Sequence, residues 1–254
     1  MWSAMQGDRR NHGGACLILV HNLRIRRWGM NTTSKTWRRL LWVGLLSASV
    51  IGCSDSSTDP SGDTDLEEIV LPLRVHLLRS SQIESLNAPL TVEQAQILVR
   101  DVSEVWAQGN IRWTVEVLVE EEAAVTPHVL SAFTGAAAVD FPVLLETVGG
   151  DPQAGGWDVY LVRDFGNAGF AGVYFSGTGM LFAKLADTND VVDLANFGTR
   201  VLSHELGHSL SLPHVPCPQA GNLMAPGCPG EVRTRLTGSQ VIAAREQARR
   251  GQPF

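Results

Sequence analysis

Four residues that can bind or use a metal ion lie within eleven positions near the carboxyl end of the chain. The stretch VLSHELGHSLSLPHVP, residues 201–216, contains His204, Glu205, His208 and His214. Two histidines four residues apart lie on one face of a helix, within reach of a common ion. A carboxylate beside the first of them can reach a water molecule on that ion and accept its proton. These are the groups that a zinc hydrolase requires.

A proline explains how a third ligand joins the first two. Pro213 cannot lie inside a helix and biases Leu212 away from helical angles, so the helix must end near Ser211. The chain can then turn back, and His214 can approach the same ion from outside the helix. A helix with two surface histidines is the alternative, but it leaves the proline and the third histidine unexplained. The residues therefore predict a three-histidine zinc site with Glu205 as general base.

This segment resembles the HExxHxxGxxH motif of the metzincin metallopeptidases. HELGHSLSLPH matches the motif at every ligand position, and GNLMAPG is similar to the family's Met-turn, with Met224 ten residues past His214. The resemblance covers residues 204–226. It implies a zinc ion held by the three histidines, Glu205 as the catalytic base, and Met224 as an apolar floor beneath the metal.

Ser211 stands where the family has glycine. That glycine commonly occupies a turn with positive φ, where serine costs on the order of 1 kcal/mol. We therefore expect Ser211 to be strained or to lie in a locally altered turn, with no ligand removed. Some metzincins have a tyrosine after the Met-turn as a further metal contact. That role has no candidate here, because Tyr160 and Tyr174 both lie upstream.

The resemblance also implies which segment binds substrate. In metzincins an edge strand just before the active-site helix pairs with an extended peptide. The candidate is the stretch from residue 179 to residue 185, and the residues expected to contact substrate are Gly179, Met180, Leu181, Phe182 and Ala183. Strand addition would supply main-chain hydrogen bonds with little sequence preference.

The elements expected around this site give an α+β fold. From alternation and β-branched residues, the predicted strands are residues 70–78, 111–119, 155–165 and 180–186. The predicted helices are residues 91–107 and 197–210, one or two within 126–148, and one from Thr237 to about Gly251. The glycine-rich residues 166–179 are expected to form a loop. By resemblance, we expect a metzincin-like zinc peptidase domain with a twisted mixed sheet, an active-site helix, and a small C-terminal subdomain carrying the Met-turn and a final helix.

The first 52 residues differ in composition from the rest. They hold eight of the twenty basic residues and four of the seven tryptophans. A basic stretch from Lys35 to Arg39 precedes an apolar run from Leu40 to Ile51, too short to span a bilayer comfortably and flanked like an export signal. Val50-Ile51-Gly52-Cys53 resembles the lipobox of bacterial lipoproteins, which implies cleavage before Cys53 and lipidation of its thiol. Met30 is then the expected start of translation.

Three regions follow from these features. They are a signal region of residues 1–52, a lipidated Cys53 with an acidic flexible tether to residue 68, and a metallopeptidase domain of residues 69–254. The protein would be exported and lipid-anchored at the bacterial cell envelope. From Cys53 onward there are 12 Lys and Arg against 25 Asp and Glu, a formal charge of −13, which disfavours nucleic acid as a partner. The expected partners are a protein or peptide substrate, and the membrane through the anchor only, for a monomeric chain.

Two further patterns bear on bound metal. Cys217 and Cys228 flank the GNLMAPG segment and are expected to form a disulfide in an oxidising compartment; thiolate metal ligands are the less favoured alternative. The DTNDVVD segment, residues 187–193, has acidic spacing that suits calcium. It misses the EF-hand pattern, so a solvated loop is expected.

A membrane-anchored, zinc-dependent metalloendopeptidase is the function that these features favour. Zinc would polarise the scissile carbonyl and acidify water, and Glu205 would take the proton and pass it to the leaving amine. One alternative is an aminopeptidase of related fold. The other is a catalytically weak zinc-binding lipoprotein that acts as a binding module, which Ser211 keeps open. His76 and His128 are expected to be ordinary histidines with no ligand role.

Overall fold

The computed structural model describes residues 66–135, 139–148, 155–166, 168–185, 191–217, 221–226 and 233–254. The signal region, Cys53, Cys228 and residues 187–190 lie outside these ranges. The expectations about export, lipidation, calcium and the Cys217–Cys228 disulfide therefore stay predictions. Within the described ranges no helix has the length and apolar character needed to cross a membrane.

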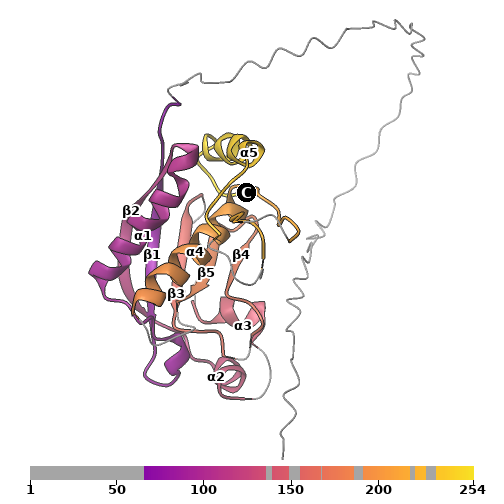
Figure 1. Ribbon diagram of the computed structural model, residues 1–254. Helices are drawn as coiled ribbons and strands as arrows, with labels where there is room; N and C mark the ends of the chain where they lie inside the picture. Colours follow the sequence, from indigo (N-terminus) through magenta and orange to yellow (C-terminus); the bar gives the residue numbers. More distant parts are fainter. Residues whose placement is uncertain are drawn as a thin grey trace, which may run out of the picture. The chain divides into compact units, whose positions relative to one another are not determined.

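A five-stranded mixed sheet forms the centre of the domain (Figure 1). Its strands are β1 (Ile69–Arg79), β2 (Ile111–Glu122), β3 (Trp157–Val162), β4 (Gly172–Phe175) and β5 (Met180–Lys184). The order across the sheet is β2-β1-β3-β5-β4, and among these strands only β4 runs antiparallel to its neighbour. The prediction of a mixed α and β class is confirmed. The prediction of a loop over residues 166–179 is wrong, because β4 lies within that stretch.

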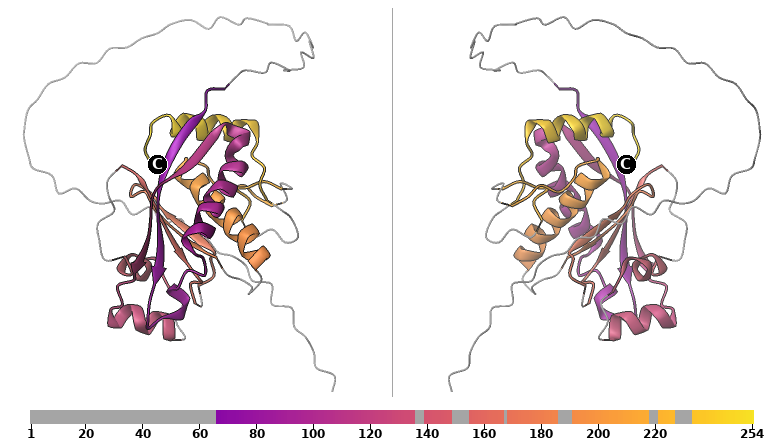
Figure 2. Two further views of the ribbon diagram at one scale, coloured as in Figure 1. Left: turned by 90° about the vertical axis from the view of Figure 1, so that its left-hand side faces the viewer. Right: turned by 90° about the vertical axis from the view of Figure 1, so that its right-hand side faces the viewer.

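The helices cover both faces of the sheet. They are α1 (Val92–Trp106), α2 (Pro127–Thr134), α3 (Phe141–Glu146), α4 (Val191–Ser209) and α5 (Gly238–Ala248), with short 3-10 turns at Glu84–Leu86 and Ala107–Gly109. Helices α1 and α4 pack on one face, and α2 and α3 pack on the other (Figure 2). Both predicted capping boxes are present: Thr91 with Gln94 begins α1, and Thr237 with Gln240 begins α5.

Three tryptophans fill the core between the sheet and helices α1 and α4. Trp113 packs edge-on against Trp106 and Trp157, with ring centroids 6.3 and 5.4 Å away. All three side chains are almost completely buried. The Trp157 indole N–H donates a hydrogen bond to Ser209 Oγ over 2.8 Å. Since Ser209 is the last residue of α4, this bond ties the end of that helix to β3 at the middle of the sheet.

The residues after α5 return to the end of α4. The Phe254 N–H donates to the carbonyl of Ser209 over 2.9 Å, and the Phe254 carbonyl accepts from the Gly177 N–H over 3.0 Å and from the Tyr174 hydroxyl. Tyr174 lies in β4 and Gly177 in the turn between β4 and β5. The tail therefore links the end of α4 to the β4–β5 hairpin.

Candidate metal centre

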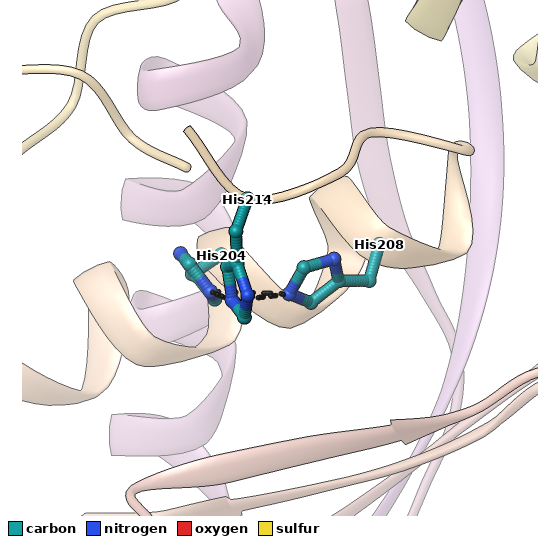
Figure 3. Close-up of side chains that lie close together, drawn as sticks. All are labelled: His204, His208 and His214. Carbon is teal, nitrogen blue, oxygen red and sulfur yellow. Dashed lines mark hydrogen bonds between the residues drawn. The ribbon is translucent and has the colours of Figure 1, made fainter. Parts of the chain in front are cut away.

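Three histidine rings meet at the carboxyl-terminal half of α4. His204 and His208 project from the helix and His214 from the segment that follows it (Figure 3). The Nε2 atom of His214 lies 3.0 Å from Nε2 of His204 and 3.0 Å from Nε2 of His208. The Nε2 atoms of His204 and His208 are 3.2 Å apart. The structure thus brings together the three histidines that the spacing predicted would share an ion.

Backbone carbonyls set the tautomers of two of these rings. Nδ1 of His204 lies 2.7 Å from the carbonyl oxygen of Leu223, and Nδ1 of His208 lies 2.8 Å from that of Leu212. A carbonyl can only accept, so each Nδ1 carries the hydrogen and each Nε2 of the neutral ring presents a lone pair. These lone pairs face one another and the ring of His214. Lone pairs gathered in this way repel unless a cation lies between them.

The spacing of the donors fits a zinc ion. A tetrahedral zinc with Zn–N bonds of about 2.0–2.1 Å holds its nitrogen ligands roughly 3.3 Å apart. The Nε2 atoms lie 3.0 to 3.2 Å apart, close to that separation. The donor set is three imidazoles, and two of them contact backbone carbonyls through Nδ1, as histidines that bind a metal ion commonly do.

Burial keeps the three rings neutral. It lowers the pKa of His204 to about 3 and that of His208 to about 4, because a buried imidazolium loses its hydration, and repulsion by the neighbouring histidines acts in the same direction. Burial also lowers the pKa of His214. Neutral imidazole is the form that binds a metal ion, so the site is ready for one at neutral pH.

The end of α4 is a Schellman motif. The Leu212 N–H donates to the carbonyl of Gly207 over 2.9 Å, and the Ser211 N–H donates to that of His208 over 2.9 Å. Ser211 has φ of 70°, in the left-handed region. The expectation of a strained Ser211 is therefore confirmed, since its side chain occupies a position that glycine adopts without strain.

This turn also orients the ligands. Leu212 is buried, and its backbone carbonyl is the one that Nδ1 of His208 contacts. Beyond it, the Val215 N–H donates to the carbonyl of Met224 over 3.0 Å, which holds the chain next to His214 against residues 221–226. The helix cap therefore reverses the chain toward His214 and fixes the ring of His208.

Residues 221–226 support α4 from the side of the core. The Met224 side chain is completely buried, and a Cβ atom placed on Gly207 would lie 2.4 Å from its Sδ. Only glycine at position 207 lets the sulfur come so close to the helix, directly before His208. The Leu223 N–H donates to the carbonyl of Arg235 over 2.7 Å, so the carbonyl that holds His204 is itself anchored.

Glu205 lies between α4 and β4 with 6% of its surface exposed. A Cβ atom on Gly172 of β4 would lie 2.6 Å from both Cγ and Oε1 of Glu205. Within the described part of the chain its carboxylate has no hydrogen-bond partner and does not join the three histidines as a ligand. Burial raises its pKa to about 8. A cation at the histidines would favour the ionised form and lower that pKa.

The edge strand expected for substrate is wrongly placed. Met180 to Ala183 lie in β5, directly after Gly179, and β5 pairs with β3 on one side and with β4 on the other, so neither of its edges is free. Among the described strands, β4 is the outer one on this side of the sheet. Its sequence Gly172-Val173-Tyr174-Phe175 carries a strand signal, three β-branched or aromatic residues in a row. The surrounding glycines masked that signal.

A second histidine site was not found by sequence reasoning. His76 in β1 contacts Glu121 through Nδ1 (2.7 Å) and Asp158 through Nε2 (3.3 Å). Arg74 donates to both carboxylate oxygens of Asp158, each over 2.7 Å. No local sequence signal links these residues, because Arg74 and Asp158 are 84 positions apart and meet only through the pairing of their strands. His128 forms an exposed pair with Glu146.

Comparison with known proteins gives weak likenesses. No protein-family model matches the chain, and no curated protein matches it. Archaemetzincin from Methanopyrus kandleri is similar in structure, with 16% identity, a TM-score of 0.43, and coverage of 72% of this chain and 95% of that one. A zinc-dependent peptidase from Methanocorpusculum labreanum has 15% identity and a TM-score of 0.37, with coverage of 67% of this chain and 99% of that one. A chain of a chaperone–substrate complex has 13% identity and a TM-score of 0.41, with coverage of 74% of this chain and 36% of that one. Likenesses this weak establish neither fold family nor chemistry, which must come from the residues of the site.

Proposed function

We propose that this protein is a zinc-dependent metalloendopeptidase of the metzincin type. The observation that carries the proposal is the set of three neutral Nε2 donors within 3.2 Å of one another, two of them oriented by backbone carbonyls. Three histidines are a usual ligand set of catalytic zinc, which keeps a fourth position open for water or substrate. The buried Met224 against α4 supports the assignment of residues 221–226 as a Met-turn.

Each residue of the site has a distinct task. Zinc, when bound, supplies polarisation of a substrate carbonyl and acidification of water. His204, His208 and His214 hold the ion, and the carbonyls of Leu223 and Leu212 keep two of those rings in the ligating tautomer. Glu205 accepts a proton from water at its carboxylate and passes it to the leaving amine nitrogen.

The outer edge of β4 is the proposed binding place for an extended peptide. The Lys184 N–H donates to the Ala171 carbonyl over 2.9 Å, so alternation directs the backbone of residues 171, 173 and 175 toward β5. The N–H and C=O groups of Gly172 and Tyr174 then face outward. Because Gly172 lies against Glu205, a peptide paired here would run beside the general base.

We also propose that the enzyme works at the bacterial cell envelope, held by lipid on Cys53. The support is the basic lead, the apolar run and the lipobox-like Val50-Ile51-Gly52-Cys53. Cys53→Ser should lose labelled fatty acid and leave the membrane fraction. Membrane retention of that variant, with no label in the wild type, would remove the basis for the anchor.

Cleavage-site profiling tests the activity. Purified wild-type protein loaded with zinc is incubated with a denatured proteome and with N-acetylated peptides, and Glu205→Gln loaded in the same way is the matched control. We expect internal cleavages by the wild type only, lost with a chelator and restored by zinc. Release of single N-terminal residues instead would indicate an aminopeptidase. If zinc-loaded wild type cleaves nothing, a binding module replaces the peptidase.

A further inference from the structure

We infer that an aromatic rim beside β4 selects large apolar residues at alternate positions of a bound peptide. The rim consists of Phe175 in β4, Phe141 at the start of α3, and Phe170 in the segment before β4. The inference rests on the proposed peptidase function and gives it a substrate class. It concerns the face of β4 that is turned away from the histidines.

Phe141 contacts both of the other rings of the rim. The centroid of Phe141 lies 5.9 Å from that of Phe175 and 5.4 Å from that of Phe170. Phe141 is 37% exposed, and Leu145, one helical turn further along α3, is 39% exposed. Figure 1 shows α3 beside β4. An apolar surface open to solvent thus borders the outer strand of the sheet.

The alternation of β4 separates this rim from the metal centre. Gly172 contacts Glu205 on the α4 face, whereas Phe175 contacts Phe141 on the α3 face. Successive side chains of a strand point to opposite faces, and residues directly opposite on a paired strand share a face. In a peptide added to β4, side chains opposite Gly172 and Tyr174 therefore lie on the α4 face. Those opposite Val173 and Phe175 lie over the rim.

The chemistry of the rim favours apolar side chains. The acidic groups at the two ends of α3 already have hydrogen-bond partners. The carboxylate of Asp140, the N-cap, accepts from the Val143 N–H over 3.1 Å, and Glu146 contacts His128 and Thr126 over 3.0 and 3.1 Å. An aromatic or large aliphatic residue would gain ring contacts and burial there. A carboxylate would lose hydration without a partner. The peptide should therefore carry large apolar residues at two positions separated by one residue.

The partly exposed ring of Phe141 is not needed to pack α3 against the sheet. Val143 and Leu144 of α3 are almost completely buried and hold the helix on the sheet. Phe141 adds a ring that leaves more than a third of its surface in solvent. Phe141→Ala should therefore leave the fold intact, which thermal unfolding followed by circular dichroism would check.

Peptide binding to a zinc-loaded Glu205→Gln protein tests the rim without cleavage. The probes are fluorescein-labelled peptides of about ten Gly and Ser residues, with Phe, Leu, Ser or Asp at two positions separated by one residue. We expect Phe and Leu peptides to bind about tenfold tighter than Ser peptides, and Asp peptides to bind most weakly. Phe141→Ala in the same background should remove that difference, and Phe141→Leu should keep most of it. Val119→Ala is the matched control, because Val119 is 38% exposed on β2 at the opposite edge of the sheet.

The outcomes separate the rim from the proposed activity. Equal binding of Phe and Ser peptides, no binding of any, or equal effects of Phe141→Ala and Val119→Ala would each overturn the inference. If the wild type then still cleaves these peptides, the proposed peptidase function is supported and the inference about the rim is wrong. If Glu205→Gln binds with the expected preference while the wild type cleaves nothing, the inference about the rim is supported and the proposed peptidase function is wrong.

Discussion

The three histidines of the metal centre and the single His76 on the sheet have opposite electrostatic surroundings. At the metal centre, His204 and His208 face carbonyl oxygens and other imidazoles, and burial drives their pKa values far below the usual range. At His76, burial also lowers the pKa, but hydrogen bonds to Asp158 and Glu121 outweigh it and the pKa is raised. The first group gathers lone pairs that suit a cation, whereas carboxylates face both nitrogens of His76 and favour its protonated form. What faces each ring nitrogen decides the role, rather than the residue type.

The His76 cluster connects three strands of the sheet. His76 lies in β1, Glu121 in β2 and Asp158 in β3, so the ring contacts carboxylates on both sides, and protonation lets both of its nitrogens donate. Burial would raise the pKa of Asp158, but the bonds from Arg74 and His76 hold it below the usual range. The ring also stacks on Tyr160, with centroids 4.5 Å apart. This cluster links the three strands and, unlike the three histidines of the metal centre, has a carboxylate against each ring nitrogen.

Removing one ligand should give the largest effect. His208→Ala should lower the zinc content from about one ion per chain to near none, because two imidazoles hold zinc poorly. Elemental analysis after dialysis measures this. His76→Ala should keep its zinc, and equal loss of zinc from the two variants would break the distinction between the clusters.

Glu205→Gln should keep zinc and lose activity. Glutamine preserves the shape of the side chain but cannot accept the proton, so kcat/KM on a cleaved peptide should fall by roughly 100-fold or more. The zinc content and the midpoint of thermal unfolding should stay near those of the wild type. Cleavage at the wild-type rate would show that a different group is the base.

Gly172→Ala should damage catalysis without touching a ligand. The added Cβ would lie 2.6 Å from Cγ and Oε1 of Glu205, so the carboxylate must move. We expect a decrease in kcat of about tenfold or more with zinc retained, because small displacements of a catalytic group are costly. Gly169→Ala is the control, since a Cβ there would meet nothing within 4 Å. Equal activity of the two variants would place the functional carboxylate elsewhere.

The two histidine groups should also respond to pH in opposite directions. The folded-state pKa of His76 is raised, so its contribution to stability is complete below the unfolded pKa and is lost as pH rises through the folded value. Zinc binding instead weakens as pH falls, because protons compete for the ligands. Urea unfolding of zinc-loaded protein should show a free energy of unfolding that declines as pH rises from the unfolded pKa of His76 through its folded pKa. His76→Gln should remove this decline. His128→Gln, at an exposed pair, should leave the decline unchanged.

Ser211→Gly should give the smallest change. Glycine adopts φ of 70° without strain, so the free energy of unfolding should rise by up to about 1 kcal/mol. Denaturant unfolding measures this gain, and zinc affinity should stay unchanged because the turn keeps its hydrogen bonds. Destabilisation would mean that the serine side chain supports the turn in another way.

Local signals predicted much of this molecule. The spacing of His204 and His208, together with Pro213, predicted the meeting of the histidines, and two capping boxes placed the starts of α1 and α5. Strands β1, β2, β3 and β5 were found from alternation and β-branched residues. These features depend on residues a few positions apart.

Pairing across the sheet was not predictable in the same way. Strand β4 is four residues long in a glycine-rich stretch, and missing it turned β5 into a false edge. The His76 cluster depends on the register between β1 and β3 and on a shift between Leu73 and Arg74 in the pairing with β2. A single sequence contains no local signal for either. The aromatic rim likewise appears only once α3 is placed on β4.

The short span of the metal centre bears on the order in which the chain folds. His204 and its carbonyl partner Leu223 are 19 positions apart, whereas Arg74 and Asp158 are 84 apart. Closing a short loop costs less chain entropy, and contacts between distant residues slow folding. We therefore expect sheet assembly to limit the refolding rate, with the ligand segments joining quickly once α4 has formed. Zinc should then lower the unfolding rate much more than it raises the refolding rate. The metal would therefore govern how long the native state lasts.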